Sequence, residues 1–146
     1  MRLHFYKDMF LLFLFFSIVF LTISCGKAED EIKNRKTVKY EVCNQEELPD
    51  ELHVLIEERM EEPFQFTYEN SAAMYIAVGY GRQDREEYVV SVREISRDGK
   101  GIIVDTILLN SSKTEEYETG EPGRCPYIVL KCEKTEAMVL FCSAME

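Results

Sequence analysis

The sequence predicts an α+β domain that is rich in β-structure, with one amphipathic helix packed on mainly antiparallel sheet built from hairpins. Three observations lead to this class. Apolar residues recur at helical spacing in one segment only, close to residue 50. After Pro63 the period of the apolar residues changes to two. Short apolar runs then alternate with turn-forming residues, as in a series of hairpins.

The first 24 residues have the layout of a secretory signal peptide. Arg2 and Lys7 make the start of the chain basic, and the run MFLLFLFFSIVFLTIS at 9–24 carries no charge. This run has 16 residues, whereas a helix that spans a membrane needs about 20. We therefore expect residues 1–24 to be a signal-peptide helix that is removed on export.

The end of this run, Leu21-Thr22-Ile23-Ser24-Cys25, resembles the lipobox of bacterial lipoproteins, although Thr22 stands where leucine is usual. Lipidation needs a thiol that accepts a diacylglycerol group and a small residue before it. Cys25 is therefore predicted to carry the lipid, and residues 25–36 (CGKAEDEIKNRK) to form a charged, solvated tether. The alternative is an uncleaved anchor helix in which Cys25 has no role. Either arrangement places the domain at the outer, extracytoplasmic face of the cell membrane.

Residues 37–146 are expected to form one domain, because a chain of this length has room for a single core. Thr37–Cys43 alternates apolar and polar residues and predicts a first strand. A helix is then expected to begin near Pro49 and to end at about Glu62, before Pro63. Its apolar face would be formed by Leu52, Leu55, Ile56 and Met60.

Three hairpins are expected after the helix. They join Phe64–Tyr68 to Ala73–Val78, Tyr88–Ile95 to Ile102–Leu109, and Pro126–Cys132 to Ala137–Cys142. The segment Asn110–Arg124 (NSSKTEEYETGEPGR) is long and polar, and we expect it to be an exposed loop.

The acidic composition argues against a nucleic-acid partner. The whole chain has a net charge of −10. Arg2, Lys7 and Asp8 leave with the signal peptide, so 15 basic and 26 acidic residues remain and the charge becomes −11. The basic residues are interleaved with Asp and Glu, whereas phosphate binding needs clustered Lys and Arg.

The sequence offers few groups for catalysis. His4 lies in the signal peptide, so His53 on the predicted helix would be the base of any Cys-His or Ser-His pair, and its surroundings favour a surface histidine instead. No GxGxxG, P-loop, HExxH or CxxC pattern is present. We therefore expect no enzyme activity, no cofactor and no metal.

Four cysteines remain once Cys25 is assigned to the lipid, and an even number in an exported domain permits disulfides. These are Cys43, Cys125, Cys132 and Cys142. If the last hairpin turns at Lys134-Thr135, Cys125 and Cys142 lie nearly opposite one another, which makes them the first pair to test. The alternative is four reduced, buried thiols.

The order of segments from about Thr37 to Phe141 resembles the PrcB C-terminal domain family. The segments that carry the resemblance are Leu48-Pro49-Asp50-Glu51-Leu52, Ile56-Glu57-Glu58, Glu62-Pro63-Phe64-Gln65-Phe66-Thr67-Tyr68, Tyr75-Ile76-Ala77-Val78-Gly79-Tyr80-Gly81-Arg82-Gln83 and Cys125-Pro126-Tyr127-Ile128-Val129-Leu130-Lys131. The family's namesake is an accessory lipoprotein that associates with and stabilises a surface subtilisin-like protease complex. The resemblance therefore implies a protein-binding accessory function and no reaction.

One turn departs from the family's pattern. A Pro-Thr-Gly-Gly-Tyr turn usually follows the Gly-x-Gln of the family; this chain keeps Gly81-Arg82-Gln83 and Tyr88 but has Asp84-Arg85-Glu86-Glu87 between them. Glycines in such a turn adopt positive φ and let a partner approach closely, which glutamates resist. The turn also has a weak likeness to the Gly-Tyr loop of chagasin-like cysteine-protease inhibitors.

The leading hypothesis is an interaction lipoprotein that binds an exported protein, such as a protease, through residues 80–87 and 110–124. The candidate contact residues are Tyr80, Arg82, Gln83, Asp84, Arg85 and Tyr117. The alternative is an envelope binding module for a small ligand or glycan, or a domain resembling a protease inhibitor.

Overall fold

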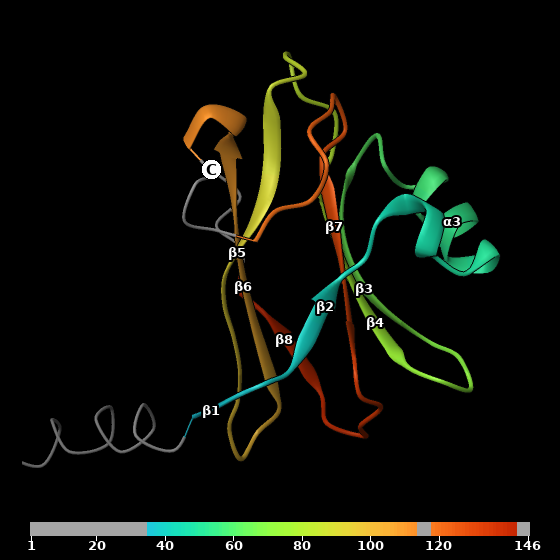
Figure 1. Cartoon of the computed structure of the whole chain (residues 1–146), viewed down its shortest axis with the longest axis vertical. Helices are drawn as coiled ribbons and strands as arrows, with labels where there is room; N and C mark the ends of the chain where they lie inside the picture. The colour runs from blue at the N-terminus through green and yellow to red at the C-terminus, as the bar shows by residue number, and fades with distance from the viewer. Residues whose placement is uncertain (1–34, 114–117, 143–146) are drawn as a thin grey trace, which may run out of the picture. The chain divides into compact units, whose positions relative to one another are not determined.

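The computed structural model describes residues 35–113 and 118–142 (Figure 1). The predicted signal peptide, Cys25 and Tyr117 lie outside these residues. The unit that begins at Lys36 contains every described helix and strand. In chain order these are β1 (Lys36–Thr37), β2 (Tyr40–Val42), the 3-10 helix η1 (Gln45–Glu47), α3 (Asp50–Glu57), β3 (Pro63–Glu69), β4 (Met74–Tyr80), β5 (Tyr88–Arg97), β6 (Ile102–Asn110), the 3-10 helix η2 (Ser111–Lys113), β7 (Tyr127–Cys132) and β8 (Val139–Phe141).

The strands form two four-stranded sheets. Sheet A has the order β1-β5-β6-β8, and sheet B has the order β2-β7-β4-β3. Every neighbouring pair is antiparallel except β6 and β8, which are parallel. Two antiparallel-rich sheets with one α-helix confirm the predicted α+β class.

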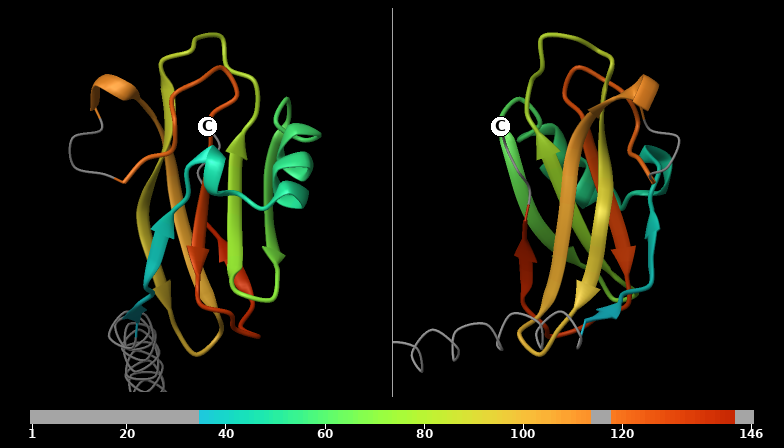
Figure 2. Two further views of the ribbon diagram at one scale, coloured as in Figure 1. Left: turned by 45° about the vertical axis from the view of Figure 1, so that its right-hand side comes forward. Right: turned by 90° about the vertical axis from the view of Figure 1, so that its left-hand side faces the viewer.

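Strand β4 is covered on both of its faces, since its seven residues are all buried. Side chains alternate between the two faces of a strand. Ile76 and Val78 therefore pack between the sheets, whereas Tyr75 and Ala77 pack toward α3. Helix α3 covers the outer face of sheet B, which gives three layers (Figure 2). The core between the sheets is formed by Met74, Ile76, Val78, Tyr80, Val90, Val92, Ile95, Ile102, Val104, Ile128, Leu130 and Cys132.

Helix α3 is shorter than predicted. It ends at Glu57, and the chain then makes tight turns in which Arg59 N–H donates to Ile56 O and Glu62 N–H donates to Arg59 O, each at 3.0 Å. The expected end at about Glu62 was wrong because Pro63 already pairs with Tyr80 as the first residue of β3. The chain must reverse direction before that residue, so residues 58–62 form turns and do not continue the helix.

The predicted strand over residues 37–43 is divided between the sheets. Its first part, β1, pairs with β5 in sheet A, and its second part, β2, pairs with β7 in sheet B. Between them Val38 N–H donates to Ile95 O at 3.4 Å, and the Val38 side chain packs on the core between the sheets. One run of alternating residues therefore serves both sheets.

The first two predicted hairpins are confirmed and the third is wrong. Strands β3 and β4 pair over their whole length, and so do β5 and β6, with a bulge between Val92 and Glu94. Strand β7, however, lies between β2 and β4, whereas β8 lies beside β6 in the other sheet. Strand β8 pairs with the free edge of β6. In this pairing Ile102 N–H donates to Met138 O at 2.8 Å and Cys142 N–H donates to Val104 O at 2.8 Å.

The predicted disulfide between Cys125 and Cys142 depended on that third hairpin. Cys125 precedes β7 in sheet B, and Cys142 follows β8 in sheet A, so the two cysteines are not on neighbouring strands. All four described cysteines are free thiols. The pairing was therefore wrong, and its cause was the wrong partner assigned to β8.

Candidate functional site

Two connections meet at one end of the sandwich, and we call them together the rim: residues 81–87, between β4 and β5, and residues 118–126, before β7 (Figure 2). Backbone hydrogen bonds join them. Gln83 N–H donates to Arg124 O at 2.7 Å, and Tyr80 N–H donates to Pro126 O at 3.1 Å. The two connections therefore form one cross-linked surface.

The predicted loop at 110–124 is described at both of its ends: Asn110 ends β6, Ser111–Lys113 form η2, and residues 118–124 are not a free loop. Val92 N–H donates to Glu118 O at 3.0 Å and Gly120 N–H donates to Val90 O at 2.9 Å, so this segment runs along β5 like a further strand. The Tyr40 hydroxyl bonds the Glu118 carboxylate, and burial together with this bond raises the pKa of Tyr40 to about 12. The segment is exposed at its tip but held at its base.

Glycine is required where this segment passes β7. A Cβ atom on Gly120 would overlap the backbone carbonyl oxygen of Tyr127. The absence of a side chain therefore lets the segment close the gap between β5 and β7.

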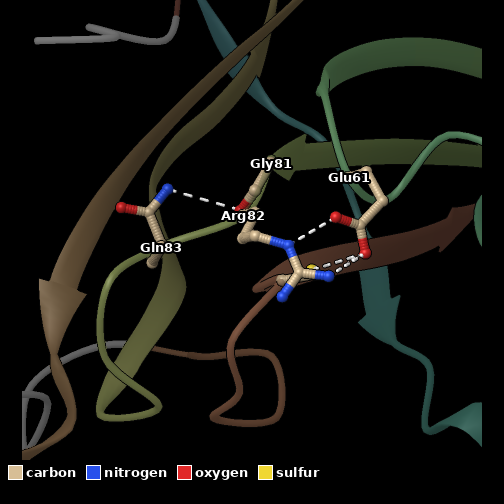
Figure 3. A network of polar contacts seen from close by, with 5 residues as sticks. Glu61, Gly81, Arg82 and Gln83 are labelled. Atoms are coloured by element: carbon tan, nitrogen blue, oxygen red, sulfur yellow. Dashed lines mark hydrogen bonds and ion pairs between the residues drawn. The ribbon is translucent and has the colours of Figure 1, made fainter.

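Arg82 fixes the rim to the turn that follows α3 (Figure 3). Its guanidinium makes two bonds to Glu61, with Nε to Oε2 at 2.5 Å and Nη2 to Oε1 at 2.6 Å. Arg82 N–H also donates to Glu61 O at 3.0 Å. The paired guanidinium lowers the pKa of the Glu61 carboxyl, and the Cys125 Sγ atom lies 3.9 Å from the same carboxylate.

Gln83 and Gly81 shape the chain on either side of Arg82. Gln83 Nε2 donates to Tyr80 O at 2.9 Å. Gly81 has φ of 70°, and a Cβ atom there would lie 2.9 Å from the Pro63 backbone nitrogen. No residue other than glycine has positive φ in the described part of the chain, so the turn at 84–87 forms without positive φ.

The predicted contact residues fall into three groups. Arg82, Asp84 and Arg85 are exposed at the rim and Gln83 is partly exposed, while Tyr117 lies outside the described residues. Tyr80 is only 7% exposed, and its hydroxyl donates to Thr106 O at 2.9 Å across the sandwich. The prediction that Tyr80 is a contact residue is therefore wrong, because its position in β4 turns its ring into the core.

A groove of about 310 Å³ opens beside the rim. Its lining includes the apolar residues Met60, Tyr127 and Val129, the polar residues Arg82 and Gln45, and residues 120–125. The Tyr127 hydroxyl bonds Gln45, and burial raises the pKa of Tyr127. No local sequence pattern predicts this groove, because its walls come from four separate stretches of the chain.

His53 lies on α3, where its Nδ1 atom is 3.6 Å from Glu57 Oε1. It does not line the groove. Across residues 35–113 and 118–142, no three His, Cys, Asp or Glu side chains are grouped so that they could hold a metal ion. In the same parts of the chain, no helix has the length and apolar composition needed to cross a membrane.

Comparison of the chain with protein-family models, with curated proteins and with solved structures found no match.

Proposed function

We propose that this chain is an exported, lipid-anchored accessory protein that binds, and stabilises, another cell-surface protein such as a protease through the rim. One observation carries the proposal: the backbone of the rim is fixed by hydrogen bonds, while the side chains of Asp84, Arg85 and Arg124 are exposed. A surface that is ordered before binding loses little conformational entropy when a partner docks. Such a surface is suited to recognising a protein.

The place where the chain enters the domain supports a rim that points away from the membrane anchor. Strand β1 pairs with Ser96 and Arg97 beside the turn at 98–101, which is the end of the sandwich opposite the rim (Figure 2). A tether over residues 25–36 that is anchored by Cys25 would therefore attach to the domain at the end away from the rim. The rim would then be open to a partner at the cell surface.

The resemblance to the PrcB C-terminal domain family also supports a protein-binding function for the rim. Gly81, Arg82 and Gln83, which match that family, brace the rim: Gly81 lies against Pro63, Arg82 bonds Glu61, and Gln83 bonds Tyr80 O and Arg124 O. The residues that depart from the family, 84–87, are exposed. We infer that the brace is shared and that the exposed turn determines which partner is bound.

Site-specific photocrosslinking in intact cells tests the proposal. A benzoylphenylalanine at Arg85 should yield one discrete crosslinked protein. The same residue at Gly99 should not, because Gly99 is equally exposed and lies at the opposite end of the domain. A crosslink from Gly99 but none from Arg85 would contradict the proposed surface.

The anchor is tested separately. Labelled palmitate should be incorporated into the wild-type chain and not into Cys25→Ala. A mature protein that retains Met1 and carries no fatty acid would contradict the lipid anchor, whatever the crosslinking shows.

The groove favours a second function, binding of a small ligand or glycan. Its volume of about 310 Å³ lies at the lower end of the range for ligand pockets, about 300–1,000 Å³. Ligands found by thermal shift should lose their effect in Met60→Glu, which changes the groove wall. They should keep it in the control Val54→Glu, since Val54 is an exposed residue of α3 outside the groove. Equal loss in both variants would exclude the groove as the binding site.

A further inference from the structure

Strand β3 forms one edge of sheet B, with β4 as its only neighbour among the described strands. Asn70 N–H donates to Ala73 O at 3.1 Å at the turn between these strands. Backbone groups in an antiparallel pair alternate between the two sides of a strand. The residues of β3 in phase with Asn70 therefore bond β4, and Thr67 and Glu69 direct their N–H and C=O groups away from β4.

A second groove, of about 480 Å³, runs beside the start of this edge. One wall is the turn at 58–62, and the other is the β3 backbone with Phe64 and Phe66. The Arg59 guanidinium carbon lies 5.4 Å from the centre of the Phe66 ring. The groove thus places apolar surface next to an open strand edge, which is the arrangement needed to bind an extended peptide by strand addition.

The charges beside the groove favour a basic peptide. Glu58 and Glu62 have no ion-pair partner among the described residues, whereas the nearby Glu61 is paired with Arg82. Arg59, the one basic residue of the wall, stacks on Phe66 and donates to Leu55 O at 3.1 Å. The wall therefore carries two carboxylates outside any ion pair against the single charge of Arg59, so its charge is negative overall.

A second copy of this chain fits the edge poorly in the register centred on Phe66. Antiparallel pairing of two β3 strands about Phe66 would place Glu69 of one copy opposite Pro63 of the other, close to Glu62. The like charges would then face one another at both ends of the paired strands, which opposes association. A partner that carries Lys or Arg meets no such repulsion.

We propose that the β3 edge binds an extended, basic segment of a partner protein, which adds as a further strand to sheet B. This site adjoins the rim, because Glu61 lines the groove and also bonds Arg82, but it is formed by β3 and the turn at 58–62. It does not depend on the lipid anchor or on the proposed function.

A random peptide library displayed on phage, selected on the full-length chain in detergent, tests the proposal. The selected peptides should be enriched in Lys and Arg, and bound peptide should protect the amides of Thr67 and Glu69 from hydrogen exchange. Thr67→Pro removes an N–H that faces away from β4 and should weaken binding at least about 10-fold. Thr67→Ala keeps this N–H and should bind like the wild type.

A second variant keeps the proposal testable if Thr67→Pro folds poorly. Glu58→Lys with Glu62→Lys changes two exposed side chains and should weaken binding of the basic peptides about 5-fold or more at low salt, with a smaller effect at high salt. Peptides that bind all variants equally, or that protect other strands, would overturn the proposal. So would the absence of any enriched peptide, or a dimer of the chain that Thr67→Pro converts to monomer.

Discussion

Tyr80→Phe should destabilise the domain, although the sequence placed Tyr80 at a binding surface. Its hydroxyl donates to Thr106 O at 2.9 Å and lies 3.2 Å from Thr106 Oγ1, and Tyr80 and Thr106 are only 7% and 1% exposed. A typical hydrogen bond contributes about 1 kcal/mol net, and a buried group that loses its partner costs about 1–3 kcal/mol. We therefore expect the free energy of unfolding to fall by about 1–2 kcal/mol.

Urea denaturation of the wild type and the variant measures this change, and thermal unfolding should show a decrease in Tm of about 4 °C or more. Thr106→Val tests the partner, and the double variant completes a cycle. Because removing both partners leaves fewer buried polar atoms unsatisfied, the double variant should lose less than the sum of the single variants, by at least about 0.5 kcal/mol. A Tyr80→Phe variant that unfolds like the wild type but no longer binds a partner would refute the buried position.

Three further predictions concern other contacts within the domain. Gly79→Ala should cost about 1–3 kcal/mol, because the added Cβ would overlap the ring of Phe64, and Phe64→Leu in the same chain should recover part of the loss in urea denaturation. The pKa of Glu61 followed by NMR should lie below the ordinary value of about 4.3 and return to it in Arg82→Met. Since that pKa is lowered by folding, the pair stabilises the domain above about pH 4.3, and this contribution is lost as the pH falls through the folded-state pKa. Tyr40 should titrate near its pKa of about 12 in absorbance measurements. An unfolded tyrosine titrates near about 10. The contribution of Tyr40 to the free energy of unfolding should therefore be complete below about pH 10 and be lost as the pH rises toward 12.

Local patterns predicted the elements well where the partner of a strand is its neighbour in sequence. Asn70 accepts hydrogen bonds from the Ala72 and Ala73 amides, and Asp98 accepts from the Lys100 and Gly101 amides. Such turns are encoded by the residues within them, so the two hairpins that they close could be predicted. The class of the fold followed from these hairpins and from the one segment with helical spacing.

Strand partners that are distant in sequence could not be predicted in the same way. The run from Thr37 to Cys43 has an alternation that suits either sheet, and only the finished sandwich divides it at Val38. Strand β8 has the composition of a third hairpin strand, but β7 already has β2 and β4 as neighbours. The edge of β6 was free, so β8 paired there.

The rim shows how strand alternation decides between a contact residue and a structural residue. Tyr80 is in phase with Ile76 and Val78, which face the core between the sheets, so the sequence already contained the signal that its ring is buried. That phase ends at Gly81, whose positive φ changes the direction of the chain and turns the Arg82 N–H toward Glu61. Tyr80 and Arg82 are both residue types that are common at binding surfaces. In this structure, however, Tyr80 packs in the sandwich, and Arg82 braces the rim by bonding Glu61. The side chains beyond the brace that face solvent are those at 84–87, and these are the ones that the proposed function assigns to a partner.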